Sequence, residues 1–304
     1  MKLLLTGAGG QLGRETAALA AARGLGLVAL DRAGLDIADA GAVAGALAQH
    51  RPDIVINAAA YTAVDRAETE PDLARAINAA GPEVLARACA RQGAGLVHVS
   101  TDYVFDGTKA GAYVESDPLA PLGVYGRTKA EGEARLRDAL DRHVILRTSW
   151  VYGVHGHNFL KTMLRLAGER DRLTVVADQH GCPTATPDIA SALLAAGEAL
   201  VAGREVAGTY HFAGTGVTSW HGFAGAIIDE AAPLTGRRPE VAAITTADYP
   251  TPARRPANSE LSSDRFAEVF GLRAMHWRER VREVVHALLG QGAASQSQPA
   301  EGTL

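Results

Sequence analysis

The first residues of the chain, MKLLLTGAGGQLG, constrain its fold more than any other stretch. A short apolar run leads into a loop in which Gly7, Gly10 and Gly13 recur at every third position, and an alanine-rich helical pattern follows. Glycines in such a loop allow a tight turn, a close approach of the backbone to a pyrophosphate, and close packing of helix on strand. The pattern predicts a strand, a phosphate-binding loop and a helix, although an ordinary β-to-α turn also uses glycine.

Apolar runs and helical patterns then alternate through the first half of the sequence. KLLLTG, LGLVALD, DIVINAAA, GLVHVSTDYVF and HVILRTSWVYG, with a short third strand at LDIAD, make six predicted strands. This alternation indicates an α/β fold, a Rossmann-type doubly wound parallel sheet covered by helices. Beyond residue 153 the pattern becomes irregular, with a helix around NFLKTMLRLAGER and a strand at LTVVAD. We therefore expect a smaller, discontinuous C-terminal lobe that binds the substrate.

The predicted domain boundaries follow from these changes of pattern. The dinucleotide-binding domain is expected over residues 1–153 and 184–214, the substrate lobe over 154–183 and 215–290, and a flexible tail over 291–304.

Composition excludes several classes of partner. The chain has 34 acidic and 30 basic side chains, a net charge of -4, and a hydrophobic fraction of 47%, which gives no electrostatic reason to bind nucleic acid or an anionic membrane. No apolar run is long enough to span a bilayer, and the N-terminus lacks a signal-peptide pattern, so we expect a cytoplasmic protein. Cys89 and Cys182 are expected to be free thiols, and His155 and His157 lack the companions of a metal site.

The residues after the second apolar run bear on the choice of cofactor. Asp31 stands where a carboxylate accepts hydrogen bonds from the adenosine ribose and repels a 2′-phosphate, which favours NADH. Arg32 follows it and is suited to neutralise a 2′-phosphate, so NADPH remains open. Asp36 is expected to reach the adenine, with Ile37 packing against the ring.

The stretch YGRTK places Tyr125 and Lys129 four residues apart, on one face of a helix. Thr101 in STDYVFDG and Trp150 in RTSWVYG follow predicted strands, and carboxyl ends of parallel strands share one edge of the sheet. A phenol, an ammonium and a hydroxyl beside a nicotinamide are the groups that carbonyl reduction needs. A lysine charge about 6 Å away supplies roughly 3 of the about 4 kcal/mol needed to bring a tyrosine pKa from about 10 to about 7. Without its neighbours, Y-x-x-x-K is more simply a surface helix pair.

With GAGGQLG, RPDIVINAAAYTAVDRAE, STDYVFDG, YGRTKAEGE, LRTSWVYG, DQHGCPT and RRPANSEL together, the chain resembles the extended short-chain dehydrogenase family, in particular its members that reduce dTDP-linked 4-keto-6-deoxy sugars. The resemblance implies that Tyr125 donates the proton, that Lys129 is its partner and a ligand of the nicotinamide ribose, and that Thr101 tunes the tyrosine.

The resemblance also implies binding residues for NADH or NADPH and for the dTDP-sugar. The cofactor set is Gly7, Gly10, Gln11, Leu12 and Gly13 at the pyrophosphate, Asp31, Arg32, Asp36 and Ile37 at the adenosine, and Ala60, Tyr61, Thr62, Tyr125 and Lys129 toward the nicotinamide. The substrate set is Thr101, Asp102, Trp150 and Arg255. Without the resemblance, the two arginines of RRPANS could equally be cations that bind a diphosphate or charges exposed to solvent.

Other readings remain open. An epimerase or a dehydratase on the same fold is one alternative, and Tyr103, in place of an acid after Asp102, argues against a dehydratase. A non-catalytic regulatory subunit is another. A homodimer and a magnesium ion are known among relatives, but no motif here establishes either.

Overall fold

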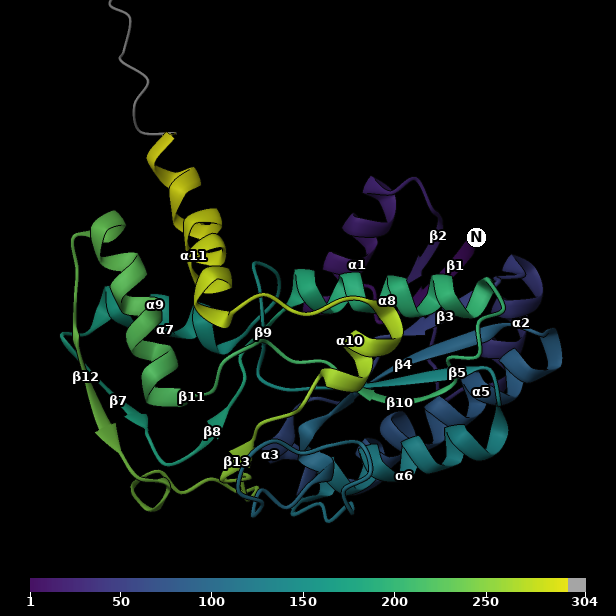
Figure 1. Ribbon diagram of the computed structural model, residues 1–304, viewed down its shortest axis with the longest axis horizontal. Coiled ribbons are helices and arrows are strands. Elements are labelled where there is room, and N and C mark those ends of the chain that lie inside the picture. The colour runs from purple at the N-terminus through teal and green to yellow at the C-terminus, as the bar shows by residue number, and fades with distance from the viewer. Residues whose placement is uncertain (295–304) are drawn as a thin grey trace, which may run out of the picture.

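The computed structural model describes residues 1–294 of the chain. Its centre is a parallel six-stranded sheet in the order β10-β5-β4-β3-β1-β2, flanked by helices on both faces, with a smaller lobe beside it (Figure 1). The strands are β1 (Lys2–Thr6), β2 (Gly26–Leu30), β3 (Ile54–Asn57), β4 (Gly95–Thr101), β5 (His143–Thr148) and β10 (Gly208–His211). The predicted α/β fold is confirmed.

Five of the six predicted strands are present, and the strand predicted at LDIAD is wrong. The sheet ends at β2, and residues 35–39 form turns because their carboxylates bind the neighbouring backbone. Asp36 accepts a hydrogen bond from the Ala38 N–H at 2.9 Å, and Asp39 caps helix α2 (Ala40–His50). Aspartate competes in this way with strand pairing. The sixth strand is instead β10, at the opposite edge and far along the chain.

Alternate residues of the strands point to the two helical layers. Leu3 and Leu5 join the core with helices α1 (Gln11–Ala22) and α8 (Thr186–Val201), whereas Leu4 lies in the core with α2, α5 (Gly81–Gln92) and α6 (Val124–Ala139). A sheet buried on both faces explains why its strands read as continuous apolar runs.

The smaller lobe has its own core. Its helices α7 (Phe159–Glu169) and α9 (Trp220–Thr235) pack beside the parallel pair β7 (Arg172–Val176) and β12 (Glu240–Ile244), and α11 (Trp277–Ala294) packs against α9 (Figure 1). Short pairings join it to the larger unit: β6 (Val151–Tyr152) with β9 (Thr184–Ala185), and β8 (His180–Gly181) with β11 (Thr218–Ser219) and β13 (Asn258–Ser259).

The remaining short helices connect these parts. They are α3 (Val64–Ala67), α4 (Pro71–Arg75), the π-helix η1 (Ala76–Ala80), the 3₁₀ helices η2 (Asp102–Val104) and η3 (Thr246–Asp248), and α10 (Asp264–Phe270). Phe266 of α10 packs in the core of the large sheet. Helix α11 continues to Ala294, inside the span predicted to be a tail, and residues 295–304 lie outside the described part.

Candidate active site

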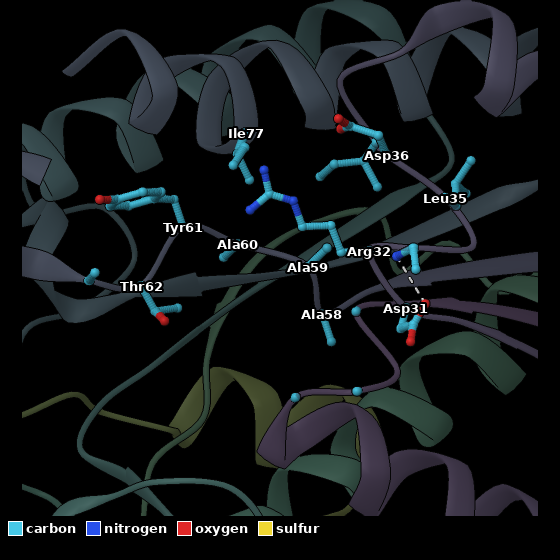
Figure 2. A pocket seen from close by; sticks show the side chains of 16 residues that line it. Asp31, Arg32, Leu35, Asp36, Ala58, Ala59, Ala60, Tyr61, Thr62 and Ile77 are labelled. Carbon is cyan, nitrogen blue, oxygen red and sulfur yellow. Dashed lines mark hydrogen bonds between the residues drawn. The ribbon is translucent and has the colours of Figure 1, made fainter. Parts of the chain in front are cut away.

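Two cavities lie along the carboxyl edge of the large sheet. They have volumes of ≈ 450 Å³ and ≈ 460 Å³, and both are lined by Gly9, Gly10, Ala58–Ala60 and Thr62. The shared lining makes them the two arms of one cleft that passes over the glycine loop. Figure 2 shows the first arm, which also contains Asp31, Arg32, Leu35, Asp36, Ile37, Tyr61 and Ile77.

The glycine loop is shaped for close backbone approach. A Cβ on Gly13 would lie 2.1 Å from the Gly7 carbonyl oxygen, and a Cβ on Gly7, which has φ 70°, would lie 2.5 Å from the Ala59 nitrogen. Helix α1 begins after Gly10 with no side-chain cap, so its first N–H groups are available to an anion in the cleft. The predicted pyrophosphate residues Gln11, Leu12 and Gly13 line the second arm. This loop fits a dinucleotide.

Asp31 and Arg32 both border the first arm. Asp31 Oδ1 accepts hydrogen bonds from the Ala33 and Gly34 N–H groups, each at 3.0 Å, and this turn fixes the carboxylate at the rim. Arg32 extends its guanidinium over the cavity (Figure 2). The first arm therefore has a carboxylate and a guanidinium side by side at its border.

Tyr61 lines the first arm, whereas the resemblance implied the nicotinamide side. Its hydroxyl donates to Glu70 at 2.5 Å, and Glu70 in turn accepts from Arg66 at 2.6 Å. Ala60 and Thr62, on either side, line both arms.

The second arm contains the predicted catalytic groups Thr101, Tyr125 and Lys129, together with Asp102 and Trp150. Helix α6 presents two of these groups, and contacts at its start fix its position. Glu68 accepts a hydrogen bond from the Val124 N–H at 2.8 Å, and a Cβ on Gly126 would lie 2.1 Å from the Tyr103 carbonyl oxygen. Sequence reasoning missed Glu68 and Gly126, because each contact joins segments distant in the chain.

The acidity of Tyr125 differs from the prediction. Burial raises its pKa above the usual value, Asp102 and Tyr103 add to this, and the Thr101 hydroxyl opposes it. In the cofactor-free chain the phenol therefore remains protonated, which is the form that donates a proton.

Lys129 faces the sheet. Its side chain is buried, and Nζ donates to the Val99 carbonyl at 2.7 Å and lies 3.2 Å from His98 Nε2. Burial lowers the pKa of Lys129 to about 8, and Glu133 opposes this change. In the cofactor-free chain β4 thus holds the amine, and an effect of its charge on the pKa of Tyr125 stays a prediction.

Asp102 is buried beside Thr101, whose hydroxyl donates to Oδ1 at 3.0 Å. Its Oδ2 is buried and has no hydrogen-bond partner within residues 1–294. Burial raises the pKa of this carboxyl to about 6. A carboxyl group of this kind is suited to bind a substrate hydroxyl.

Trp150 forms an aromatic wall of the second arm. It has φ 48°, a left-handed conformation uncommon for a large residue, and stacks on Trp220 with centroids 3.6 Å apart. A Cβ on Gly181 would lie 2.7 Å from the Trp150 ring. Sequence reasoning missed Trp220 and Gly181; the scarcity of tryptophan, three in the chain, was the available signal.

Arg255 lines neither arm of the cleft. Its Nη2 pairs with Asp65 Oδ2 at 2.7 Å, and Asp65 Oδ1 also accepts from the Ala253 N–H at 3.2 Å. Nη1 is buried without a hydrogen-bond partner among the described residues.

The loop between the two lobes closes the second arm beside the glycine loop. Gly156 and His157 line the arm, and a Cβ on Gly156 would lie 3.1 Å from Gln11 Cβ. Asn158 Nδ2 donates to Gln11 Oε1 at 3.3 Å and to the Gly153 carbonyl at 2.8 Å. These contacts tie the entrance of the smaller lobe to the first helix.

Residues 1–294 show neither a cluster of metal-ligating side chains nor a helix that could span a membrane. No group of three or more His, Cys, Asp or Glu side chains is placed to hold a metal ion. None of the helices there has the length and apolar character needed to cross a bilayer.

The chain matches a known protein family over most of its length. The family model described as the RmlD substrate binding domain matches residues 1–289. A dTDP-4-dehydrorhamnose reductase of Aggregatibacter actinomycetemcomitans is 48% identical over 287 residues, covering 93% of this chain and 98% of that protein. A crystal structure of a dTDP-4-dehydrorhamnose reductase from Clostridium acetobutylicum has a TM-score of 0.88 and 39% identity, covering 95% of this chain and 99% of that one. The Bacillus anthracis enzyme of the same name, in complex with NADP, has a TM-score of 0.86 and 36% identity, covering 93% and 99%.

Proposed function

This chain belongs to the dTDP-4-dehydrorhamnose reductase family, and from that premise we propose that it reduces the C4 ketone of dTDP-4-dehydro-β-L-rhamnose to dTDP-L-rhamnose with Tyr125 as the proton donor. This reaction is a step in dTDP-rhamnose and polysaccharide biosynthesis. The observation that carries the proposal is the continuous cleft that joins the glycine loop to Tyr125, Thr101 and Asp102.

The cofactor is NADH or NADPH, and when bound it supplies the hydride. The glycine loop and the uncapped start of α1 bind the pyrophosphate, and the first arm holds the adenosine between Asp31, Arg32 and Ile37. Lys129 is assigned to the nicotinamide ribose, where its amine orients the hydroxyls.

Tyr125 gives its phenolic proton to the C4 oxygen as negative charge develops there. The raised pKa keeps this proton in place before reaction, and the Thr101 hydroxyl then turns from Asp102 to donate to the phenolate that remains. Asp102 binds a sugar hydroxyl, and the indole of Trp150 packs against the apolar face of the sugar. The pair of tryptophans also limits access of water to the ketone.

The smaller lobe, residues 154–183 and 215–290 apart from α10, is proposed to bind the nucleotide part of the substrate. Arg255, whose Nη2 pairs with Asp65 of α3, is proposed to contact the diphosphate through its guanidinium, giving up part of its hydrogen bonding to Asp65. We also propose that the protein works in the cytoplasm, as a monomer or as a homodimer.

Coupled turnover tests the proposal. The purified chain is mixed with dTDP-glucose and the upstream dehydratase and epimerase, and oxidation of NADH and of NADPH is followed by absorbance in separate reactions. We expect oxidation that depends on all three enzymes. Absence of oxidation with both cofactors would contradict the reductase assignment, and NAD that stays bound through purification without net oxidation would indicate an epimerase.

A further inference from the structure

A row of buried polar side chains crosses the large sheet beneath the cleft. Thr6, Asn57 and His98 are partners in register on β1, β3 and β4, and each has 0% of its surface exposed. Thr6 Oγ1 donates to Asn57 Oδ1 at 2.7 Å, and Asn57 Nδ2 lies 2.9 Å from His98 Nδ1. The row begins at the residue before the glycine loop and ends at Lys129, which lies 3.2 Å from His98 Nε2.

The orientation of the Asn57 amide is determined by a backbone group. The Ala59 N–H donates to Asn57 Oδ1 at 3.1 Å, and a backbone N–H has no acceptor capacity, so the oxygen must face it. The amide nitrogen, which can only donate, therefore faces His98 Nδ1. It follows that Nδ1 accepts this hydrogen bond and carries no proton.

The tautomer of His98 follows from this arrangement. Burial, together with the nearby Lys129, lowers the pKa of His98 well below its usual value, so the imidazole is neutral. A neutral imidazole without a proton on Nδ1 carries it on Nε2. The Nε2–H group then points at Lys129 Nζ.

An Nε2–H donor is compatible with only one form of Lys129. An ammonium has three donors and no acceptor, so it would oppose this N–H group, whereas a neutral amine accepts from it through its lone pair. The neutral amine still donates to the Val99 carbonyl at 2.7 Å. Burial also favours the neutral amine, because it lowers the pKa of Lys129 to about 8.

The other charged and titratable groups near Lys129 do not reverse the preference for its neutral amine. Glu133, one helical turn further along α6, raises the pKa of Lys129, but its carboxylate is already bound by Arg147 at 2.9 and 2.6 Å and by Ser100 at 2.5 Å. Tyr125, one turn earlier, is held uncharged by the raised pKa that burial causes.

We propose that His98 is a positioning residue, held by Asn57 with its proton on Nε2, which favours the neutral form of the Lys129 amine over the ammonium in the cofactor-free chain. The inference rests on the proposed function, because that function uses Lys129 at the nicotinamide ribose. Lys129 takes up a proton from solvent when it turns away from His98 and Val99 toward the cleft. The row thus links the protonation state of Lys129 to β1, the strand that leads into the glycine loop.

Nuclear magnetic resonance reads the tautomer directly and needs no turnover. The cofactor-free chain is labelled with ¹⁵N-histidine, and the signals of His98 are identified by their loss in His98→Gln. We expect a protonated Nε2 and an unprotonated Nδ1 above about pH 8, where the Lys129 amine is neutral. A proton on Nδ1, or on both nitrogens, overturns the proposal.

The variant Asn57→Asp reverses the direction of the hydrogen bonds from residue 57 through His98 to Lys129, with little change in side-chain shape. A carboxylate only accepts, so His98 must donate through Nδ1, and its Nε2 then accepts from a Lys129 ammonium. We expect the ¹⁵N signals to show the other tautomer, and the basic limb of the pH profile of kcat/KM to move upward by about one unit, a tenfold change in proton affinity.

Gln49→Glu is the matched control, because it makes the same amide-to-acid change on the exposed face of α2 and should move neither readout. An unchanged tautomer or an unchanged basic limb in Asn57→Asp overturns the proposal. A chain that fails to reduce the dTDP-sugar leaves the magnetic-resonance result valid, so failure of the proposed function is distinguishable from failure of this inference.

Discussion

Glu133→Gln should destabilise the chain strongly, because Glu133 and Arg147 form an ion pair inside the large domain. The carboxylate is fully buried, its partner is 3% exposed, and two hydrogen bonds of 2.9 and 2.6 Å join them, with a third from Ser100 at 2.5 Å. Removing one partner of a buried pair leaves the other charge uncompensated, at a cost of about 3–5 kcal/mol. For a chain of this length an unfolding entropy of about 0.6 kcal/mol/K converts about 4 kcal/mol into a fall in Tm of about 6 °C.

The assay is urea unfolding followed by circular dichroism, with thermal unfolding as a second measurement. Glu131→Gln is the matched control, because Glu131 lies on the same helix but forms partly exposed pairs with Arg75 and Arg135. Such pairs contribute at most about 1 kcal/mol. Equal losses in the two variants, or a loss below about 1 kcal/mol in Glu133→Gln, would refute the reasoning.

The loss of stability in Glu133→Gln should also depend on pH. Burial raises the pKa of Glu133, but Arg147 and Ser100 outweigh it, so the pKa in the folded chain is lowered. A lowered folded pKa contributes stability above the unfolded value, about 4.3, and this contribution is lost as pH falls through the folded value. The difference between wild type and Glu133→Gln should therefore shrink as the pH falls below about 4.

Three further predictions concern the cleft. Tyr125→Phe should lower kcat by about 100-fold or more while the dissociation constant for NADH, measured by fluorescence titration, changes only a few-fold; unchanged turnover would remove the phenol from its role. Arg32→Ala should raise the KM for NADPH by about tenfold, the equivalent of about 1.4 kcal/mol, with little change for NADH, and equal effects on both would contradict the assignment to a 2′-phosphate. Gly181→Ala should raise the KM for the dTDP-sugar, because its Cβ would lie 2.7 Å from the Trp150 ring, whereas NADH binding measured by calorimetry should be unaffected; a normal KM would show that the ring position does not matter.

Much of the cleft was predictable because its signals are local in the sequence. Gly7 provides the positive-φ turn of the glycine loop and Gly13 packs against the Gly7 carbonyl, both within one strand–loop–helix unit. A four-residue spacing places Tyr125 and Lys129 on one face of α6. The parallel sheet then brings Thr101, at the end of β4, to the same edge. Periodicity, turn chemistry and the rule for strand ends are sufficient for each of these placements.

The other features depend on contacts that sequence spacing does not encode. The sixth strand comes from residues 208–211. At LDIAD no strand forms, because the Asp36 carboxylate accepts a hydrogen bond from the backbone N–H of Ala38. Arg255 pairs with Asp65, 190 positions away, and Trp150 stacks on Trp220 across the junction of the two lobes.

Lys129 illustrates this division between sequence and tertiary structure. The sequence by itself determined that a lysine stands one helical turn after a tyrosine at the carboxyl edge of a parallel sheet. Only the tertiary structure decided that its amine faces Val99 and His98, 30 and 31 positions away. The physical reason is that helix periodicity specifies the face of a side chain, whereas its charge and its partners depend on which buried groups from other strands complete its hydrogen bonds.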